Sequence, residues 1–186
     1  VGIDAQITAD PEALLKSDKV IFPGVGSAES AVDTLKTRGL DEALKDFYRS
    51  GRPLLGICLG LQIILEYTEE GSRDCLGLME GACERFDFTD GSIKVPHIGW
   101  NEVEMVQSHP LLKDVRSGDE FYFVHSYFAN LKESSSIYGV TEYGEKQFAS
   151  IIASDNLFAT QFHLEKSGEL GLRLLAEFAD WQGGSC

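Results

Sequence analysis

The stretch Pro53-Leu54-Leu55-Gly56-Ile57-Cys58-Leu59-Gly60-Leu61-Gln62 decides how the rest of the chain is interpreted. Its apolar start predicts a buried strand, and the apolar periodic residues after Cys58 predict a helix that begins at once. A glycine stands two residues to either side of the cysteine, because larger side chains would collide with a sharp strand-to-helix turn. The stretch therefore predicts a nucleophile elbow that carries a thiol in place of a hydroxyl.

Cys58 is predicted to lie at the N-terminus of that helix. The free backbone N–H groups and the helix dipole there favour the thiolate, which is the reactive form of cysteine. The alternative is a buried structural cysteine in a tight turn, since free cysteines are among the most buried residues. The elbow alone leaves both interpretations open.

The composition indicates one domain, residues 1–186, with an acidic surface. The chain has 186 residues, 43% of them apolar, which is enough for one core and too little for two. A net charge of -14 without a basic cluster argues against binding to nucleic acid or to an anionic membrane. Without a stretch of transmembrane length or a signal peptide, the chain is expected to be cytoplasmic.

The cysteines do not indicate a disulfide framework or a metal site. There are four, Cys58, Cys75, Cys83 and Cys186, and they form no C-x-x-C pair. Cys75 and Cys83 are interpreted as two ordinary buried thiols. We expect neither a metal nor a cofactor.

The order of predicted elements indicates an α/β fold. Helices are predicted from Asp10, over residues 28–48 with a break near Gly39, from Cys58 to a glycine stop at Gly71, and over residues 169–181. Strands are predicted before Cys58 and at residues 5–8, 19–22, 77–88, 94–106, 120–127, 137–142, 148–154 and 157–162, with a turn at 89–91. This pattern predicts an open, mostly parallel sheet with helices on both faces and added antiparallel strands.

The loop Pro23-Gly24-Val25-Gly26-Ser27 follows the second predicted strand. Two glycines in such a loop indicate a tight turn or a close approach of the backbone to another group. A phosphate cradle is disfavoured because the loop has neither the spacing nor the lysine of a P-loop. The open alternatives are a site for backbone donors beside Cys58 and an ordinary connection.

A cysteine nucleophile needs a base, and the chain has four histidines. His109 precedes a proline in a polar turn and is predicted to be exposed, while His97 and His125 lie in aromatic stretches that favour a packing or interface role. His163 ends a predicted strand, and Glu165 follows on the same side of the extended backbone. This pair predicts a base oriented by a carboxylate, although H-x-E pairs also occur by chance on surfaces.

Taken together, residues 56–62, the Pro23–Gly26 loop and His163-Leu164-Glu165 resemble the class I (triad) glutamine amidotransferases over nearly the whole chain. Within that family, the loop and the stretches Pro96-His97-Ile98-Gly99-Trp100-Asn101 and Phe123-Val124-His125-Ser126-Tyr127 are similar to the glutaminase subunits of imidazole glycerol phosphate synthase. The resemblance implies hydrolysis of L-glutamine and delivery of ammonia to a TIM-barrel cyclase within a heterodimer of histidine biosynthesis. It implies no cofactor.

The resemblance also implies a role for individual residues. Cys58 is the nucleophile, His163 the base and then the acid, and Glu165 its orienting partner. The backbone at Gly24 and Val25, after a peptide rearrangement, and the N–H of Leu59 hold the oxyanion. Gln62 and Glu70 hold the substrate, while Trp100 and Lys166 face the partner.

One departure and three alternatives accompany this resemblance. Members of the family begin with a further strand and helix, so we expect the sequence to be truncated at its N-terminus. The alternatives are a glutaminase of another synthase, such as the anthranilate or pyridoxal phosphate enzymes, a stand-alone cysteine hydrolase or peptidase, and a regulatory binding module. The last is disfavoured because Cys58, His163 and Glu165 are all present.

Overall fold

A mixed sheet of eleven strands runs through the part of the chain that the computed structural model describes, residues 2–88, 91 and 93–184. Its parallel part is made of β1 (Val20–Gly24), β2 (Leu54–Cys58) and β11 (Leu157–Thr160), in that order across the sheet. β2 is central, and all five of its residues are buried. The carboxyl ends of β1 and β2 lie side by side, with Gly24 in register with Cys58.

Mostly antiparallel pairs extend this parallel part, and the exception is β3 (Tyr67–Thr68), which pairs with β5 (Gly81–Arg85) in parallel. β10 (Lys146–Ser154) pairs with β11, and the sheet continues through β8 (Tyr127–Leu131), β5, β3 and β4 (Arg73–Asp74). β9 (Ile137–Tyr143) also pairs with β10 and joins it to β6 (His97–Met105) and β7 (Asp119–His125). The predicted α/β fold with added antiparallel strands is confirmed, and antiparallel pairs outnumber parallel ones among the described strands.

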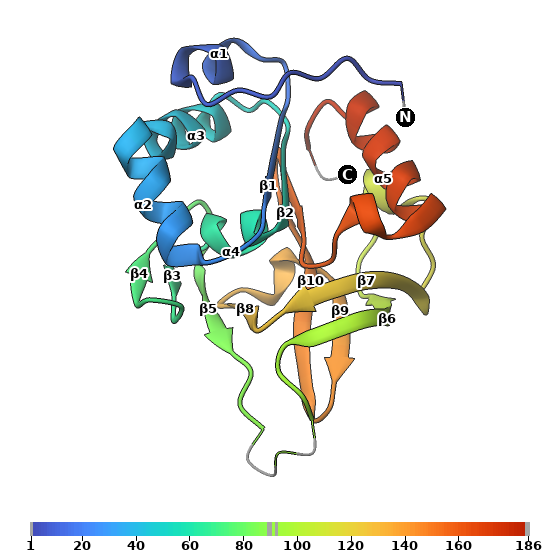
Figure 1. The fold of residues 1–186 in the computed structure, drawn as a ribbon. Helices are drawn as coiled ribbons and strands as arrows, with labels where there is room; N and C mark the ends of the chain where they lie inside the picture. The colour runs from blue at the N-terminus through green and yellow to red at the C-terminus, as the bar shows by residue number, and fades with distance from the viewer. Residues whose placement is uncertain (1, 89–90, 92, 185–186) are drawn as a thin grey trace.

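Helices cover both faces of the parallel strands, as predicted (Figure 1). One side carries α2 (Ala28–Arg38), α3 (Leu40–Arg49) and α4 (Leu59–Ile64), and the other carries α5 (Gly168–Asp180). The shorter helices are α1 (Pro11–Lys16), η1 (Pro110–Leu112), η2 (Ser134–Ser136) and η3 (Leu164–Lys166). In the described residues, no helix combines the length and apolar character that a membrane crossing requires.

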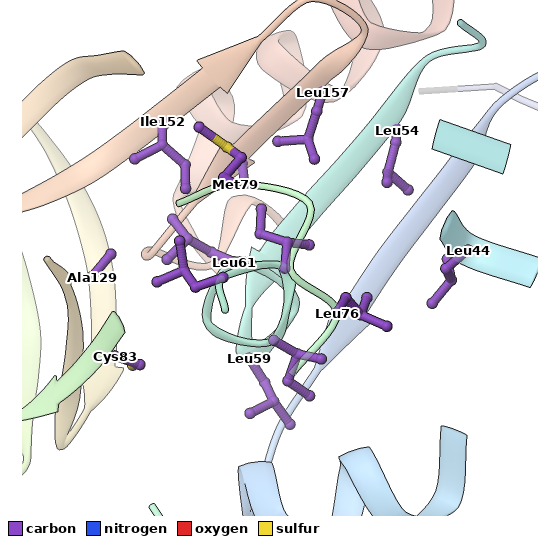
Figure 2. Packing of buried hydrophobic residues seen from close by; sticks show 14 of the residues in the cluster. Leu44, Leu54, Leu59, Leu61, Leu76, Met79, Cys83, Ala129, Ile152 and Leu157 are labelled. Carbon is purple, nitrogen blue, oxygen red and sulfur yellow. The ribbon is translucent and has the colours of Figure 1, made fainter. Parts of the chain in front are cut away.

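The two faces of the sheet have separate apolar cores. Successive β2 residues alternate between them, since Leu54 packs with α2–α4 and Leu55 with α5. Figure 2 shows the core on the side of α2–α4, where Leu59 and Leu61 of α4 pack with Leu76 and Met79 beside them. Helix α4 is therefore buried on all sides, which fixes the position of Cys58 at its start.

The structure differs from the sequence-based prediction in several segments, among them the strands β3, β4 and β8, which were not predicted. Residues 5–8 form no strand, because no neighbouring strand shares hydrogen bonds with them. Helix α4 ends at Ile64, earlier than the apolar periodicity indicates, because Leu65 is extended and the chain enters β3. The break at Gly39 is confirmed, with a φ of 67° that glycine adopts at no steric cost. The predicted turn at 89–91 includes residues outside the described part.

Candidate active site

Cys58 occupies a strained elbow between β2 and α4. Its φ of 53° and ψ of -103° are rare for a side chain with a Cβ atom. The glycines on either side permit this geometry: a Cβ on Gly60 would lie 2.0 Å from the Phe22 carbonyl oxygen, and one on Gly56 would lie 3.0 Å from the Ala159 Cβ. The predicted elbow is therefore present, and the need for small residues around it has a direct steric cause.

A cavity of about 510 Å³ opens at the elbow. Its lining includes Val25, Cys58, Leu59, Gln62, Glu70, His163 and Lys166, which come from distant parts of the sequence. Gly24 is not part of the lining but pairs with Cys58 across the strands. The structure thus gathers most of the predicted site residues around one space, at the carboxyl ends of parallel strands where α/β sheets hold their ligands.

Glu165 orients the imidazole of His163. Its Nδ1 lies 2.7 Å from the Glu165 Oε1. A carboxylate only accepts, so Nδ1 carries a proton, and in the neutral imidazole the lone pair is then on Nε2. Nε2 is buried and has no hydrogen-bond partner among the described residues. The backbone is fixed as well, because the His163 N–H donates to Tyr122 and the Ser167 hydroxyl donates to the His163 carbonyl.

The surroundings of Cys58 favour the protonated thiol over the thiolate. Burial raises its pKa to about 11, and the charge of Glu165 adds to the rise, whereas the N–H of Leu59 and the Gln161 amide lower it. The sequence-based prediction of a favoured thiolate is therefore wrong for this state, because burial outweighs the short helix α4. No hydrogen bond joins Cys58 to His163 in the described structure. A nucleophilic role for this sulfur would consequently require a base that takes the thiol proton, and the role of His163 as that base stays a prediction.

The predicted oxyanion segment lies beside the thiol. Gly24 packs closely on α4, since a Cβ there would lie 2.9 Å from the Leu59 Cβ. Val25 is 74% exposed and lines the cavity, and Gly26 has a φ of 95° with open space around it. The N–H of Leu59 contacts the Cys58 sulfur. This placement is compatible with a donor pair at the elbow, and the oxyanion role of Gly24, Val25 and Leu59 stays a prediction.

Gln62 and Glu70, the predicted substrate residues, already have protein partners. The Gln62 Nε2 donates to the Tyr127 carbonyl at 2.9 Å and to the Gln161 Oε1 at 3.3 Å. The Glu70 Oε2 accepts from the Ala28 N–H at 2.7 Å, at the start of α2. Both line the cavity, and their binding of substrate stays a prediction. Gln161 was not among the residues predicted for the site, although a polar residue at the end of an apolar strand was a signal for it.

An exposed apolar and basic surface lies near the cavity. Trp100 is 53% exposed and Ile98 59%, and both stand on β6. The rings of Trp100 and Tyr122 meet edge-on, with 6.2 Å between their centroids. The Lys166 Nζ lies 5.9 Å from the centre of the same tyrosine ring. Trp100 and Lys166 thus share one neighbour, and their contact with a partner stays a prediction.

Three further histidines are buried. His97 and His125 pack among aromatic rings, as predicted, and the His97 Nδ1 lies 2.9 Å from the His125 Nε2. The prediction that His109 is exposed is wrong, because Pro110 begins η1, which packs against α5 and places the imidazole beside Phe158 and Trp181. Burial lowers the pKa of His97 and His109 to about 4 and that of His125 to about 3.

We expect these three histidines to make the fold sensitive to acid. The unfolded chain binds protons at each histidine near pH 6.5, well above the pKa of the folded form, so stability falls as the pH drops below 6.5. Each group contributes nearly 1.4 kcal/mol per pH unit, so the free energy of unfolding should fall by about 5 kcal/mol between pH 7 and pH 5. Urea unfolding at both pH values measures this. His109→Phe should reduce the fall by about one third, and a pH-independent stability would contradict the prediction.

Comparisons with known proteins agree with this geometry. Residues 2–180 match the family model described as "Glutamine amidotransferase class-I". The "Imidazole glycerol phosphate synthase subunit HisH" of Maridesulfovibrio salexigens is 46% identical over 97% of this chain and 87% of the relative. The subunit of the same name from Neisseria meningitidis serogroup B is 44% identical over 94% of this chain and 84% of the relative.

A solved structure supports the fold independently of sequence. A protein described as "Crystal structure of glutamine amidotransferase" superposes with a TM-score of 0.71 at 16% identity, covering 96% of this chain and 88% of that one. From the family match and the relatives above, the chain belongs to the class-I glutamine amidotransferases and, within them, to the HisH subunits of imidazole glycerol phosphate synthase.

Proposed function

We propose that the chain hydrolyses L-glutamine to glutamate and ammonia with the triad Cys58, His163 and Glu165, and passes the ammonia to a cyclase. The observation that carries the proposal is that the strained Cys58 and His163 line one cavity, and that the His163 Nε2 has no hydrogen-bond partner within the described residues. A thiol nucleophile next to a base that is oriented by a carboxylate is the arrangement that acyl transfer requires.

The chemistry follows from these positions. His163 Nε2 takes the thiol proton, and the Cys58 sulfur attacks the γ-carbonyl carbon of glutamine. The N–H groups of Val25 and Leu59 hold the oxyanion, and loss of one such donor typically slows acyl transfer roughly a hundred- to a thousand-fold. The imidazolium then protonates the leaving nitrogen, the C–N bond breaks, and ammonia departs from a thioester.

The second half of the reaction returns the site to its first state. Water replaces ammonia in the cavity, and His163 Nε2 takes a proton from it as it attacks the thioester carbon. The C–S bond breaks, glutamate is released, and the imidazolium returns its proton to the Cys58 sulfur. Glu165 stabilises the imidazolium in both halves through the 2.7 Å hydrogen bond to Nδ1.

The partner is a TIM-barrel cyclase that binds the surface around Trp100 and Lys166. The relatives are named as subunits of imidazole glycerol phosphate synthase, which supports a second subunit that consumes the ammonia. Exposed aromatic and apolar residues are typical of the centre of a protein interface, and charged side chains such as Lys166 are typical of its polar rim. This surface adjoins the cavity, since Lys166 belongs to both.

Glutamate release from glutamine tests the proposal, measured for the chain alone and with the cyclase of a HisH-containing enzyme loaded with its nucleotide substrate. We expect at least a tenfold stimulation, because the exposed Val25 segment gains its donor position only in the complex. Trp100→Ala should weaken the stimulation without abolishing the basal rate. Equal rates of glutamate release with and without cyclase would favour a stand-alone hydrolase. Stimulation by the synthase of another pathway would show that the chain is a glutaminase of that synthase.

A further inference from the structure

The Tyr127 carbonyl oxygen accepts two side-chain hydrogen bonds and thereby fixes the orientation of two groups. One comes from the His125 Nδ1 at 2.8 Å and the other from the Gln62 Nε2 at 2.9 Å. A carbonyl oxygen only accepts, so both partners must present an N–H to it. The identity of the donor atom, which crystallographic maps rarely distinguish in amides and imidazoles, is therefore set here by the chemistry of the acceptor.

The histidine branch is rigid. Since His125 Nδ1 donates, its Nε2 is an acceptor, and the His97 Nδ1 at 2.9 Å must donate to it. The His97 Nε2 then accepts from the Asn101 Nδ2 at 3.2 Å. Both imidazoles are buried, so each is held as one neutral tautomer. The hydrogen bond from His125 therefore fixes the position of the Tyr127 carbonyl.

The amide branch ends at the nucleophile. The two N–H groups of Gln62 point to the Tyr127 oxygen and to the Gln161 Oε1 at 3.3 Å. With its oxygen engaged, Gln161 turns its Nε2 toward the Cys58 sulfur, at 3.8 Å. Gln161 is fully buried. Its backbone N–H donates to the Ser150 carbonyl, so both the backbone and the side chain of the residue are held by hydrogen bonds.

We propose that Gln161 is a further catalytic residue of this site, whose amide N–H, oriented by Gln62, stabilises the Cys58 thiolate while it forms. A donor aimed at a sulfur gains strength when the sulfur becomes charged, because hydrogen bonds to ionised groups are about twice as strong as neutral ones. It acts where water is excluded, so the stabilisation is not lost to solvent. The catalytic role of Gln161 rests on the proposed glutaminase function, whereas the effect of Gln161 on the pKa of the Cys58 thiol does not.

The experiment is alkylation of Cys58 by iodoacetamide at pH 8 in the absence of glutamine, followed by peptide mass spectrometry to separate Cys58 from the other thiols. Gln161→Met keeps the volume and removes the donor, so the pKa of the thiol should rise by about one unit. The rate should then fall about threefold, since a tenfold loss of thiolate is partly offset by higher nucleophilicity. Gln161→Glu keeps the acceptor for Gln62 and faces the sulfur with an oxygen, so it should be slower still, by tenfold or more.

Ser150→Ala is the matched control. The Ser150 hydroxyl is buried beside Gln161 and has no hydrogen-bond partner within the described residues, so its loss should leave the alkylation rate unchanged. Gln62→Met tests the same inference through the orienting residue. Without the hydrogen bond from Gln62, the Gln161 amide loses its orientation, so the alkylation rate should fall toward that of Gln161→Met. A thermal melt identifies any variant that does not fold.

Folded Gln161→Met and Gln161→Glu proteins that react as fast as the wild type would overturn the inference, even if glutaminase activity is present. If alkylation slows as expected but the wild-type chain with loaded cyclase does not hydrolyse glutamine, the effect of Gln161 on the thiol holds and the proposed function fails. With glutaminase activity present, kcat should fall in Gln161→Met while KM changes little, which a merely structural role would not produce.

Discussion

Cys58→Ala should lower the rate of glutamate release by at least a thousandfold. The alanine has no nucleophile, and water attacking the amide directly retains only the help of the oxyanion donors and of binding. Because the cavity gains rather than loses space, glutamine should still bind, so the loss should be in kcat. Glutamate formation is measured with the stimulating cyclase present, and binding by calorimetry.

Cys75→Ala is the control for loss of a thiol. Cys75 is half-buried and lies outside the cavity, with its sulfur facing the Arg73 carbonyl at 3.7 Å. Its removal should leave the rate within about twofold of the wild type, because surface changes away from a site are usually small. Turnover by Cys58→Ala close to the wild-type rate would exclude covalent catalysis at the elbow.

Gly60→Ala should destabilise the fold by about 3 kcal/mol or more. The added Cβ would lie 2.0 Å from the Phe22 carbonyl oxygen, which belongs to the backbone of β1 and has no room to move while β1 pairs with β2. Either α4 or β1 must shift, and both hold the predicted oxyanion groups. Urea unfolding gives the loss of stability, and activity should fall with it.

Gly51→Ala separates this clash from the cost of backbone conformation. Gly51 has a φ of 77° and open space around its Cα, so alanine there meets only the left-handed penalty of about 1 kcal/mol. Equal destabilisation by the two substitutions would mean that the elbow relaxes freely and that the glycine is not required by packing.

The sequence predicts those features of the site that depend on local geometry. The glycines around Cys58, the break at Gly39 and the H-x-E spacing each reflect neighbouring residues along the chain, and all three are present as predicted. The helices on both faces follow from apolar periodicity, which is also a local signal.

Features that depend on contacts between distant residues were not predictable in this way. The burial of His109 arises from packing of η1 against α5, and the protonated Cys58 thiol reflects surroundings contributed by several strands. The hydrogen bonds from Gln62 to Tyr127 and Gln161 join residues far apart in sequence. Residues 5–8 have strand-like composition, but a strand also requires a neighbour with which to pair.

The central claim is that glutamine hydrolysis passes through a thioester on Cys58, and trapping with hydroxylamine tests it most directly. A thioester carbonyl is open to attack by any nucleophile that enters the cavity, so hydroxylamine should divert the product from glutamate to γ-glutamyl hydroxamate while ammonia release continues. We predict hydroxamate with the wild-type chain and none with Cys58→Ala. Glutamate as the sole product at saturating hydroxylamine would contradict the account, because water would then attack the amide without a covalent intermediate.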